Sequence, residues 1–201
     1  YLDGRIIRYF DGKDDYEVMS VDDMHLFGNH NYENVMAAIA MTIEAGVPLN
    51  IIINVIKDFM GVEHRIEYVR DKNGVRYYND SKGTNPDSSI KALEAMSRPT
   101  ILIAGGYDKH SEFDEFIEAF DNKVKLMVLL GQTADKIEET AVRHGFTNII
   151  KTDSLEKAVK ICAENAVSGD VVLLSPACAS WGMFKNYEER GKLFKEYVNS
   201  L

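Results

Sequence analysis

The run YYNDSKGTNPDSSIKAL, residues 77–93, brings an acid, a lysine, hydroxyls, a glycine and a proline together between apolar flanks. Asp80, Lys82 and Thr84 supply a carboxylate, an ammonium group and a hydroxyl at alternate positions. A carboxylate can accept hydrogen bonds from ligand hydroxyls, and an ammonium group or a hydroxyl can donate to an anion. This mixture indicates a polar binding site for a ligand that carries negative charge.

Polar loops of the same kind follow three other apolar runs. Lys109 lies in GGYDKHSE after TILIA, the loop GQT follows VKLMVLL, and Ser175 and Ser180 lie in SPACASW after DVVLL. In open α/β sheets, ligands bind beyond the carboxyl ends of the strands, so we expect the four loops to converge on one edge. Lys82 and Lys109 would then place two cations near helix N-termini, which already favour anions.

A structural interpretation of these residues is simpler. Gly83 and Pro86 could shape a turn between strand and helix, and Asp80 or Asn85 could cap the helix that follows. Two lysines at successive strand ends favour the ligand-binding interpretation. We expect Trp181, in the loop SPACASW, to be a packing residue and not a ligand contact.

Several common signatures are absent from the sequence. No GxxxxGK[ST] P-loop for a triphosphate occurs, and no GxGxxG for a dinucleotide follows the first strand of the repeat. The two cysteines, Cys162 and Cys178, form no CxxC pair and have no histidine at zinc spacing. We therefore expect a reduced cytoplasmic protein in which Cys178 is a small buried residue and not a nucleophile.

From about residue 64, strand and helix patterns alternate. RIEYV and VRYYN flank Asn73-Gly74, which is a hairpin signal, and the helix PDSSIKALEAM has Pro86 in its first turn. Residues 111–120 have phenylalanines at helical spacing, and Ser154 is a suitable N-cap for a later helix. Short connections between these elements predict an α/β fold, a Rossmann-like, mostly parallel sheet with helices on both faces.

Residues 1–63 have a different pattern. Short strands flank Asp11-Gly12, and two helices follow in NYENVMAAIAMTIEAG and PLNIIINVIKDFMG. Two helices and a few strands make a thin core for a segment of this length. We interpret it as the end of a larger domain. Because the sequence also lacks an initiating Met, we expect it to be part of a longer protein.

Composition limits the partners. The chain has 201 residues, of which 45% are hydrophobic, and its net charge is −9. No Lys/Arg-rich run occurs, which disfavours nucleic acid and anionic membrane as partners. No apolar run approaches the roughly 18 residues of a membrane span. An anionic ligand must therefore be held by a few individually placed cations.

The longer motifs resemble a known family. They resemble the C-terminal domain of the Mur ligases, in particular of those that add D-glutamate. The similar segments are HRIEYV, NGVRYYNDSKGTNPDS, ILIAGGYDK and GDVVLLSPACASWGMFKNYEERGKLFKEYV. FGNHNYENVMAAIA resembles the end of that family's central ATP-binding domain. The resemblance implies that residues 1–63 are the C-terminal remnant of the central domain. It implies that residues 64–201 are the C-terminal, Rossmann-like amino-acid-binding domain.

The resemblance also implies an activity for the parent protein. Members of this kind use ATP and Mg²⁺ to form an amide bond between UDP-N-acetylmuramoyl-L-alanine and D-glutamate, a step of peptidoglycan precursor synthesis. We expect a cytoplasmic monomer with no nucleic-acid or membrane partner. The family's P-loop, magnesium ligands and carbamylated lysine are missing from this sequence. We therefore expect this chain alone to be inactive.

Matching the motifs residue by residue implies three groups of site residues. Lys82 corresponds to the catalytic lysine that approaches the phosphates. Nucleotide-binding residues, with the last at the ribose, would be Asn31, Asn34, Arg65 and Asp80. D-Glutamate-binding residues would be Thr84, Lys109, Ser180 and Tyr187. D-Glutamate has two carboxylates, and an ammonium or hydroxyl donor can meet each of them.

Two other functions are open on the sequence. Without a P-loop, the chain could be a non-catalytic anion- or nucleotide-binding module. It could also come from a sister Mur ligase that adds another amino acid. Sister ligases that add a dibasic amino acid resemble one another in a D-N-P-[RA] motif, which this sequence lacks. The density of matched motifs favours the D-glutamate ligase.

Overall fold

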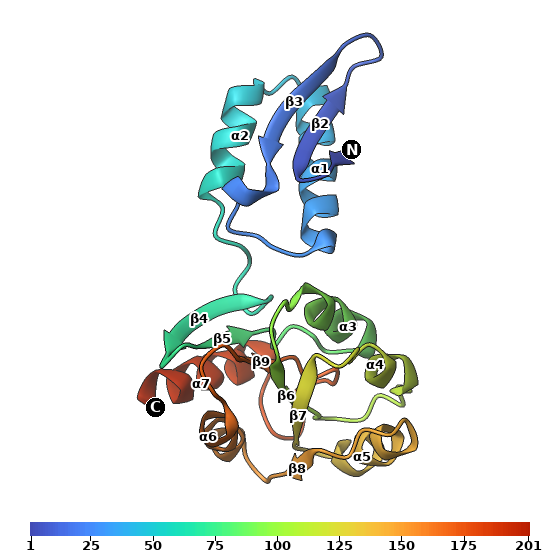
Figure 1. The fold of residues 1–201 in the computed structure, drawn as a ribbon, viewed down its shortest axis with the longest axis vertical. Helices are drawn as coiled ribbons and strands as arrows, with labels where there is room; N and C mark the ends of the chain where they lie inside the picture. The colour runs from blue at the N-terminus through green and yellow to red at the C-terminus, as the bar shows by residue number, and fades with distance from the viewer. The chain divides into compact units, whose positions relative to one another are not determined.

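The computed structural model describes residues 1–201, and its internal contacts separate two compact units, Tyr1–Gly61 and Val62–Leu201 (Figure 1). The separation falls two residues before the predicted boundary between residues 63 and 64. We refer to the two parts as the N-terminal unit and the C-terminal unit.

The C-terminal unit is built on one six-stranded sheet with the strand order β4-β5-β9-β6-β7-β8. Its strands are β4 (Glu67–Lys72), β5 (Val75–Asn79), β6 (Thr100–Ala104), β7 (Val124–Leu129), β8 (Ile149–Lys151) and β9 (Val171–Leu174). β4 runs antiparallel to β5, and every other neighbouring pair is parallel. The prediction of a mostly parallel sheet is therefore confirmed.

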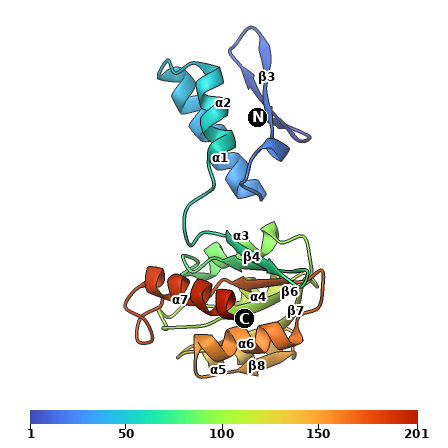
Figure 2. The same ribbon diagram turned by 90° about the vertical axis from the view of Figure 1, so that its left-hand side faces the viewer.

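Helices cover both faces of this sheet, as predicted (Figures 1 and 2). One face carries α3 (Pro86–Ala95), α4 (Asp114–Glu118) and α5 (Ala134–Arg143), and the other carries α6 (Leu155–Asn165) and α7 (Tyr187–Ser200). Because both faces are covered, the central strands are apolar without alternation, and every residue of β6 and β9 is buried.

The hairpin and the helix starts follow their sequence signals. Asn73 and Gly74 have positive φ, 56° and 78°, as a two-residue type I′ turn requires. The Asn85 side chain accepts a hydrogen bond from the Ser88 N–H at the start of α3. Ser154 caps α6 in the same way. These caps fix the points at which the loops after β5 and β8 end.

The helix predicted for residues 111–120 forms only over α4, Asp114–Glu118. Asp121 and Asn122, with φ of 39° and 57°, turn the chain away soon after α4, so the helix stays short. The aromatic residues of this segment are nevertheless buried, as predicted, and pack edge to face in sequence: Phe113, Phe116 and Phe120.

The N-terminal unit is smaller. It contains β1 (Leu2–Asp3), β2 (Ile6–Phe10), β3 (Asp15–Ser20), the 3-10 turn η1 (Val21–Asp23), α1 (Asn29–Glu44) and α2 (Leu49–Asp58). The three strands form an antiparallel sheet. The core is small and consists of Ile7, Val18, Met19, Val21, Val35, Ile39 and Ile52. In the whole chain the longest helix, α1, has 16 residues, and no helix has the length and apolar character of a membrane span.

Candidate functional site

Four loops meet at the carboxyl edge of the parallel strands. The Tyr107 N–H, after β6, donates to the Ala179 carbonyl, after β9, at 2.9 Å. Thr133, after β7, accepts the Gly106 N–H at 3.0 Å through its hydroxyl. The loop after β5 joins the loop after β9 through Asp80. The predicted convergence of the four loops is therefore confirmed.

Asp80 is buried beneath this edge, with 4% of its surface exposed. Its Oδ1 accepts the Ile66 N–H at 3.2 Å, and its Oδ2 lies 2.7 Å from the Ser175 hydroxyl. Burial raises the pKa of Asp80 to about 7, although both hydrogen bonds and the charges of Arg65 and Arg190 oppose the rise. Asp80 thus ties the loop after β5 to the loop after β9.

A series of hydroxyls continues from Asp80 into the loop after β9. Ser175 Oγ lies 2.8 Å from Ser89 Oγ, which accepts the Ala177 N–H at 2.9 Å. Ala177 has φ of 56°, a left-handed conformation that costs a residue with a Cβ about 1–3 kcal/mol. The hydrogen bond to Ser89 holds the loop in this strained conformation.

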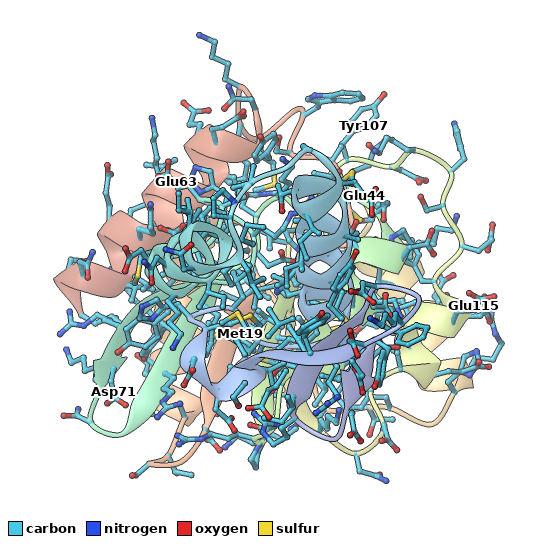
Figure 3. All side chains as sticks on the ribbon, turned by 90° about the horizontal axis from the view of Figure 1, so that it is seen from above. Met19, Glu44, Glu63, Asp71, Tyr107 and Glu115 are labelled. Carbon is cyan, nitrogen blue, oxygen red and sulfur yellow. The ribbon has the colours of Figure 1, made fainter.

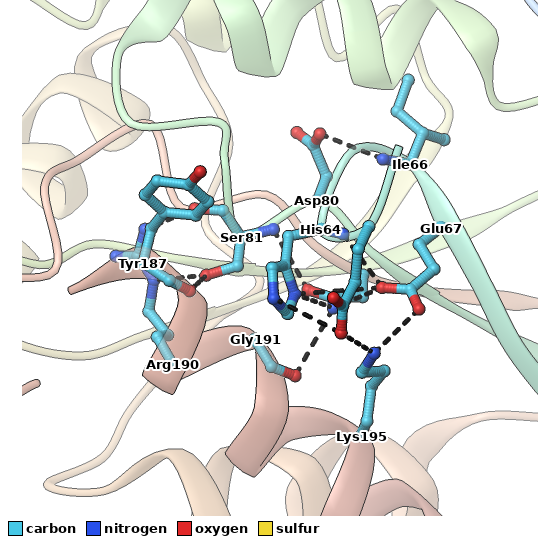
Figure 4. A network of polar contacts seen from close by, with 11 residues as sticks. His64, Ile66, Glu67, Asp80, Ser81, Tyr187, Arg190, Gly191 and Lys195 are labelled. Carbon is cyan, nitrogen blue, oxygen red and sulfur yellow. Dashed lines mark hydrogen bonds and ion pairs between the residues drawn. The ribbon is translucent and has the colours of Figure 1, made fainter. Parts of the chain in front are cut away.

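Arg190 contacts the same two loops and is 2% exposed. Figure 4 shows it with Ser81 and Tyr187. Its Nε and Nη2 donate to the hydroxyl and carbonyl of Ser81 at 3.0 and 2.7 Å, and its Nη1 donates to the Cys178 carbonyl at 3.1 Å. None of these acceptors is a carboxylate. Burial lowers the pKa of Arg190 to about 10, which leaves the guanidinium charged near neutral pH.

Sequence reasoning did not identify Arg190, although a usable signal exists. Arg190, Phe194 and Val198 are spaced by four residues in α7 and are all buried. Residues four apart lie on one face of a helix, so an arginine occupies the core-facing side. A buried arginine needs several hydrogen-bond acceptors, so its position in the helix could have indicated a polar contact under the loops.

A second polar cluster surrounds His64 (Figure 4). His64 is 3% exposed, and its Nδ1 lies 2.9 Å from Asn79 Nδ2. Its Nε2 is buried without a hydrogen-bond partner, 3.6 Å from Glu63 Oε1. Lys195 of α7 pairs with both Glu63 and Glu67, at 2.7 and 2.9 Å. These contacts attach α7 to the segment that enters β4.

This cluster is also the one group of side chains spaced to hold a cation. It does not fit magnesium, which demands octahedral oxygen coordination. The Nδ1 of His64 faces the side-chain amide of Asn79, and the Lys195 ammonium already pairs with both carboxylates. We assign no magnesium ligand to this chain.

Lys82 and Tyr187 come together at the rim. The Lys82 Nζ lies 5.7 Å from the centroid of the Tyr187 ring. Lys82 and Thr84 are half-buried, and the Thr84 N–H donates to the Lys82 carbonyl at 2.8 Å. One tight turn after β5 therefore carries both of these predicted site residues.

Lys109 and Ser180 lie in adjoining loops with unequal exposure. Ser180 is 4% exposed, whereas Lys109 is exposed with its Nζ 5.9 Å from the centroid of the Trp181 ring. Tyr107, at the periphery of the view in Figure 3, packs edge to face on Trp181 with the centroids 5.6 Å apart. Trp181 is 55% exposed, so the packing that we expected for it takes place at the rim, against Tyr107.

The predicted nucleotide-binding residues are divided between the two units. Arg65 and Asp80 belong to the C-terminal unit, where Arg65 is exposed. Asn31 and Asn34 belong to α1 of the N-terminal unit, three residues apart and so on one side of the helix. Asn31 Nδ2 donates to the Phe27 carbonyl at 2.8 Å. Within each unit, the predicted residues lie near one another.

The covered parallel sheet, with polar loops joined at its carboxyl edge, defines an α/β ligand-binding domain. Over residues 64–178 the sequence matches the family described as Mur ligase, glutamate ligase domain. The chain therefore belongs to the Mur ligase family.

Similar curated proteins have names from this family. The chain is 64% identical over 201 residues to a UDP-N-acetylmuramoylalanine–D-glutamate ligase from Lachnospira eligens, covering 100% of this chain and 45% of that protein. It is 57% identical over 195 residues to a ligase of the same name from Lachnoclostridium phytofermentans, covering 97% of this chain and 43% of that protein. The chain thus spans somewhat less than half the length of these relatives.

Solved structures share the fold. A pseudomurein peptide ligase type C from Methanothermus fervidus aligns with a TM-score of 0.72 at 15% identity, over 99% of this chain and 40% of that one. A MurF ligase from Thermotoga maritima, in complex with ADP, aligns with a TM-score of 0.60 at 22% identity, over 100% of this chain and 45% of that one. At these identities the likeness shows the fold alone.

Proposed function

We propose that this chain is the C-terminal portion of an ATP-dependent ligase that joins D-glutamate to UDP-N-acetylmuramoyl-L-alanine. The observation that carries the proposal is the pair of matched loops, NDSKGTN after β5 and SPACAS after β9. They are held against each other at the carboxyl edge by buried hydrogen bonds. The names of the relatives from L. eligens and L. phytofermentans support D-glutamate as the amino acid.

The proposed reaction is an acyl transfer in two steps. ATP phosphorylates the carboxylate of UDP-N-acetylmuramoyl-L-alanine, and ADP leaves. The amine of D-glutamate then attacks the acyl carbon, and the tetrahedral intermediate expels phosphate as the amide forms. Both steps need cations near phosphoryl oxygens and a positioned amine.

In this proposal, two adjoining loops supply most of the groups that meet the acceptor and the phosphates. Lys82 approaches the phosphoryl oxygens as the catalytic lysine. Thr84, Ser180 and Tyr187 line the D-glutamate pocket, and Lys109 pairs with one of its carboxylates. Lys109 is exposed with its ammonium over the Trp181 ring, so the ammonium can meet a carboxylate while it keeps that contact.

We propose that Asn31, Asn34, Arg65 and Asp80 bind the nucleotide, with Asp80 at the ribose. The ADP complex of the T. maritima MurF ligase supports a nucleotide ligand for this fold. A carboxylate offers about four lone-pair sites, and the contacts from Ile66 and Ser175 use two of them. The remaining sites could accept hydrogen bonds from a ribose diol.

We also propose that the complete enzyme is a cytoplasmic monomer without nucleic-acid or membrane partners. The net charge of −9 and the lack of a Lys/Arg-rich run support this part of the proposal. Light scattering on the purified full-length ligase should give the mass of one chain. A stable dimer would contradict the monomer.

The activity test compares this chain with the full-length ligase. With ATP, UDP-N-acetylmuramoyl-L-alanine and D-glutamate, the 201-residue chain should release phosphate only at the background rate, because it has no P-loop. The full-length ligase should release phosphate when D-glutamate is added and not with a dibasic amino acid. Turnover by the isolated chain, or a preference of the complete enzyme for another amino acid, would contradict the proposal.

The missing P-loop favours one other function, a stand-alone nucleotide-binding module. Calorimetric titration of the 201-residue chain with ATP tests it, because such a module should bind ATP without further domains. The ligase proposal expects little or no heat from this titration. Tight ATP binding by a chain whose full-length form makes no amide would favour the module.

A further inference from the structure

We propose that Arg190 is a positioning residue that sets the spacing between the loop carrying Lys82 and Thr84 and the loop carrying Ser180. This inference deepens the proposed function, and its kinetic test rests on that function. The inference is carried by the buried guanidinium, which donates to both loops at once. Figure 4 shows Arg190 with Ser81 and Tyr187.

The acceptors of Arg190 lie beside the predicted ligand residues. Ser81, which receives two of the hydrogen bonds, immediately precedes Lys82, and Cys178 lies two residues before Ser180. The guanidinium is planar and its donors are fixed relative to one another. A shift of this group therefore moves two separate loops, and a misplacement of about 1 Å can reduce the rate of a reaction about a hundredfold.

Stability alone gives no reason for an arginine here. A buried charge loses its hydration, and well-packed apolar residues of similar volume often replace buried charged groups without loss of stability. Arg190 also has no carboxylate among its hydrogen-bond partners that would compensate its charge. An apolar side chain could fill the space, but it could not fix the Ser81 carbonyl against the Cys178 carbonyl.

The same contact extends to the start of α7. The Ser81 hydroxyl accepts from Arg190 and donates to the Tyr187 carbonyl at 2.8 Å. Arg190 thus orders three predicted site segments, at Lys82, Ser180 and Tyr187, through one buried residue. None of its own hydrogen bonds leads to the rim, so we do not describe it as catalytic.

The experiment uses the full-length ligase with Arg190→Lys and Arg190→Met. The lysine variant keeps the charge but loses the planar set of donors, whereas the methionine variant loses both. Arg70 provides the matched control, because its Nη1 contacts the carbonyls of Val198 and Asn199, at 3.4 and 3.2 Å, at the other end of α7. Arg70→Met removes hydrogen bonds from an arginine to carbonyls of the same helix, α7, and leaves the contacts of the two loops intact.

The kinetic arm is measured well below the melting temperature of each variant. Arg190→Lys should raise KM for D-glutamate about tenfold and lower kcat about tenfold, and Arg190→Met should do more. KM for UDP-N-acetylmuramoyl-L-alanine should hardly change, since no residue of this chain is assigned to that substrate. Arg70→Met should leave kcat and both KM values unchanged. A merely structural role would lower the melting temperature and leave the kinetic constants of the folded enzyme intact.

Amide hydrogen exchange provides an arm that does not depend on the reaction. In Arg190→Lys, amides of residues 81–84 and 177–180 should exchange about tenfold faster, as expected if about 1.4 kcal/mol of local stability is lost. Arg70→Met should leave these amides unchanged. If Arg190→Met or Arg190→Lys fails to fold, Ser81→Ala removes the hydroxyl alone and should show the same pattern at about a third of the size.

The outcomes separate the two proposals. If a folded Arg190 variant keeps normal KM, kcat and loop exchange, the positioning role is wrong. Loop exchange that rises while the kinetic constants stay normal also overturns it, because the spacing then has no effect on the site. If the wild-type ligase does not use D-glutamate, the proposed function fails. Faster exchange in both loops of Arg190→Lys would then still support the role of Arg190 in spacing them.

Discussion

Two packed loops, 80–85 and 175–180, differ from the open loop, 107–112, although all three follow neighbouring strands of one sheet. In the packed loops, Asp80 and Ser180 are each 4% exposed, and buried side chains bind the loop backbones. In the open loop, Tyr107 is 40% exposed and Lys109 is exposed with its ammonium over an aromatic ring.

The difference shows that one site edge can hold its residues in two ways. The packed loops are ordered before a ligand arrives, which reduces the ordering cost of binding. The open loop carries a charge that stays hydrated and can move toward a ligand. Substitutions under the packed loops should therefore change stability, whereas substitutions in the open loop should change binding alone.

The largest effect should come from Asp80→Asn, measured as stability against pH. Asp80 has a folded pKa of about 7, against 3.8 as its ordinary value, so between these values the folded state binds more protons than the unfolded state. The stability that the folded state gains from the protonated Asp80 is fully present below about pH 4 and is lost as pH rises to 7. The loss is on the order of 4 kcal/mol.

Asparagine resembles the protonated carboxyl, because Oδ1 can still accept from Ile66 and the amide can donate to Ser175. Denaturant unfolding of this chain and of Asp80→Asn should therefore agree near pH 4 and diverge by pH 8, with the variant more stable. Parallel curves would show that Asp80 is ionised throughout.

In the full-length ligase, Asp80→Ala should raise KM for ATP if the ribose assignment is right. An increase in KM for D-glutamate instead would move Asp80 to the acceptor pocket.

The next effect should come from Gly191→Ala, which tests the close approach of α7 to His64 in the segment that enters β4. A Cβ at Gly191 would collide with the ring of His64, which is buried and held by Asn79. Overpacking typically costs about 1–3 kcal/mol, and displacing His64 would leave polar groups unpaired at a similar cost. We expect a loss of about 3 kcal/mol, less the gain of about 0.5–1 kcal/mol for replacing glycine in a helix.

Thermal unfolding of this chain measures the effect of Gly191→Ala, and the double variant with His64→Ala provides the control. Removing the ring removes the collision, so the two substitutions should be strongly non-additive. Additive losses would mean that α7 can shift to accommodate the methyl group. In that case the contact between α7 and His64 would be less constrained than the hydrogen bonds around His64 suggest.

The fold of the C-terminal unit was predictable because its signals are local. The Asn73-Gly74 turn, the Asn85 and Ser154 caps and the unbroken apolar strands each depend on a few adjacent residues. The rule that ligands bind at the carboxyl ends of parallel strands then placed the loops together. The short α4 was not predicted, because the positive φ values that follow it belong to residues other than glycine.

The interior of the site was less predictable, because it depends on contacts between residues far apart in sequence. Arg190 contacts Ser81 across 109 positions, and Ser175 contacts Asp80 across 95. Motif spacing identified Asp80 as a polar residue of the site but not its burial. Packing was expected for Trp181, but its partners Tyr107 and Lys109 could not be predicted, because they lie in a different loop.

Lys109→Ala tests the open loop and should affect binding alone. If the ammonium pairs with a D-glutamate carboxylate, its loss should cost about 1.5–3 kcal/mol, or about a ten- to hundredfold higher KM for D-glutamate in the full-length ligase. KM for ATP and the melting temperature should hardly change. Lys109→Arg should recover only part of the affinity, because a planar fork does not replace a point charge.

Lys136→Ala is the matched control for Lys109, because its Nζ lies 5.8 Å from the Phe113 ring in a comparable cation–π contact. Lys136 also pairs with Glu112 of the open loop at 3.6 Å, but it is not assigned to the acceptor pocket. Lys136→Ala should leave KM for D-glutamate unchanged. A normal KM in Lys109→Ala would remove the most charged member from the proposed acceptor pocket. A large fall in melting temperature would show that the open loop is ordered like the packed loops.

The smallest effect should come from Trp181→Ala. The Trp181 ring lies beneath the Lys109 ammonium and packs on Tyr107. An exposed cation–π contact contributes about 0.5–1 kcal/mol, so losing it should raise KM for D-glutamate about two- to fivefold in the full-length ligase. Trp181→Phe keeps a ring and should stay closer to the wild-type KM.

In a Lys109→Ala background, Trp181→Ala should not raise KM further, because the partner of the ring is already gone. An equal increase in both backgrounds would mean that Trp181 acts on the ligand itself, and the open loop would then hold its site residues independently of each other.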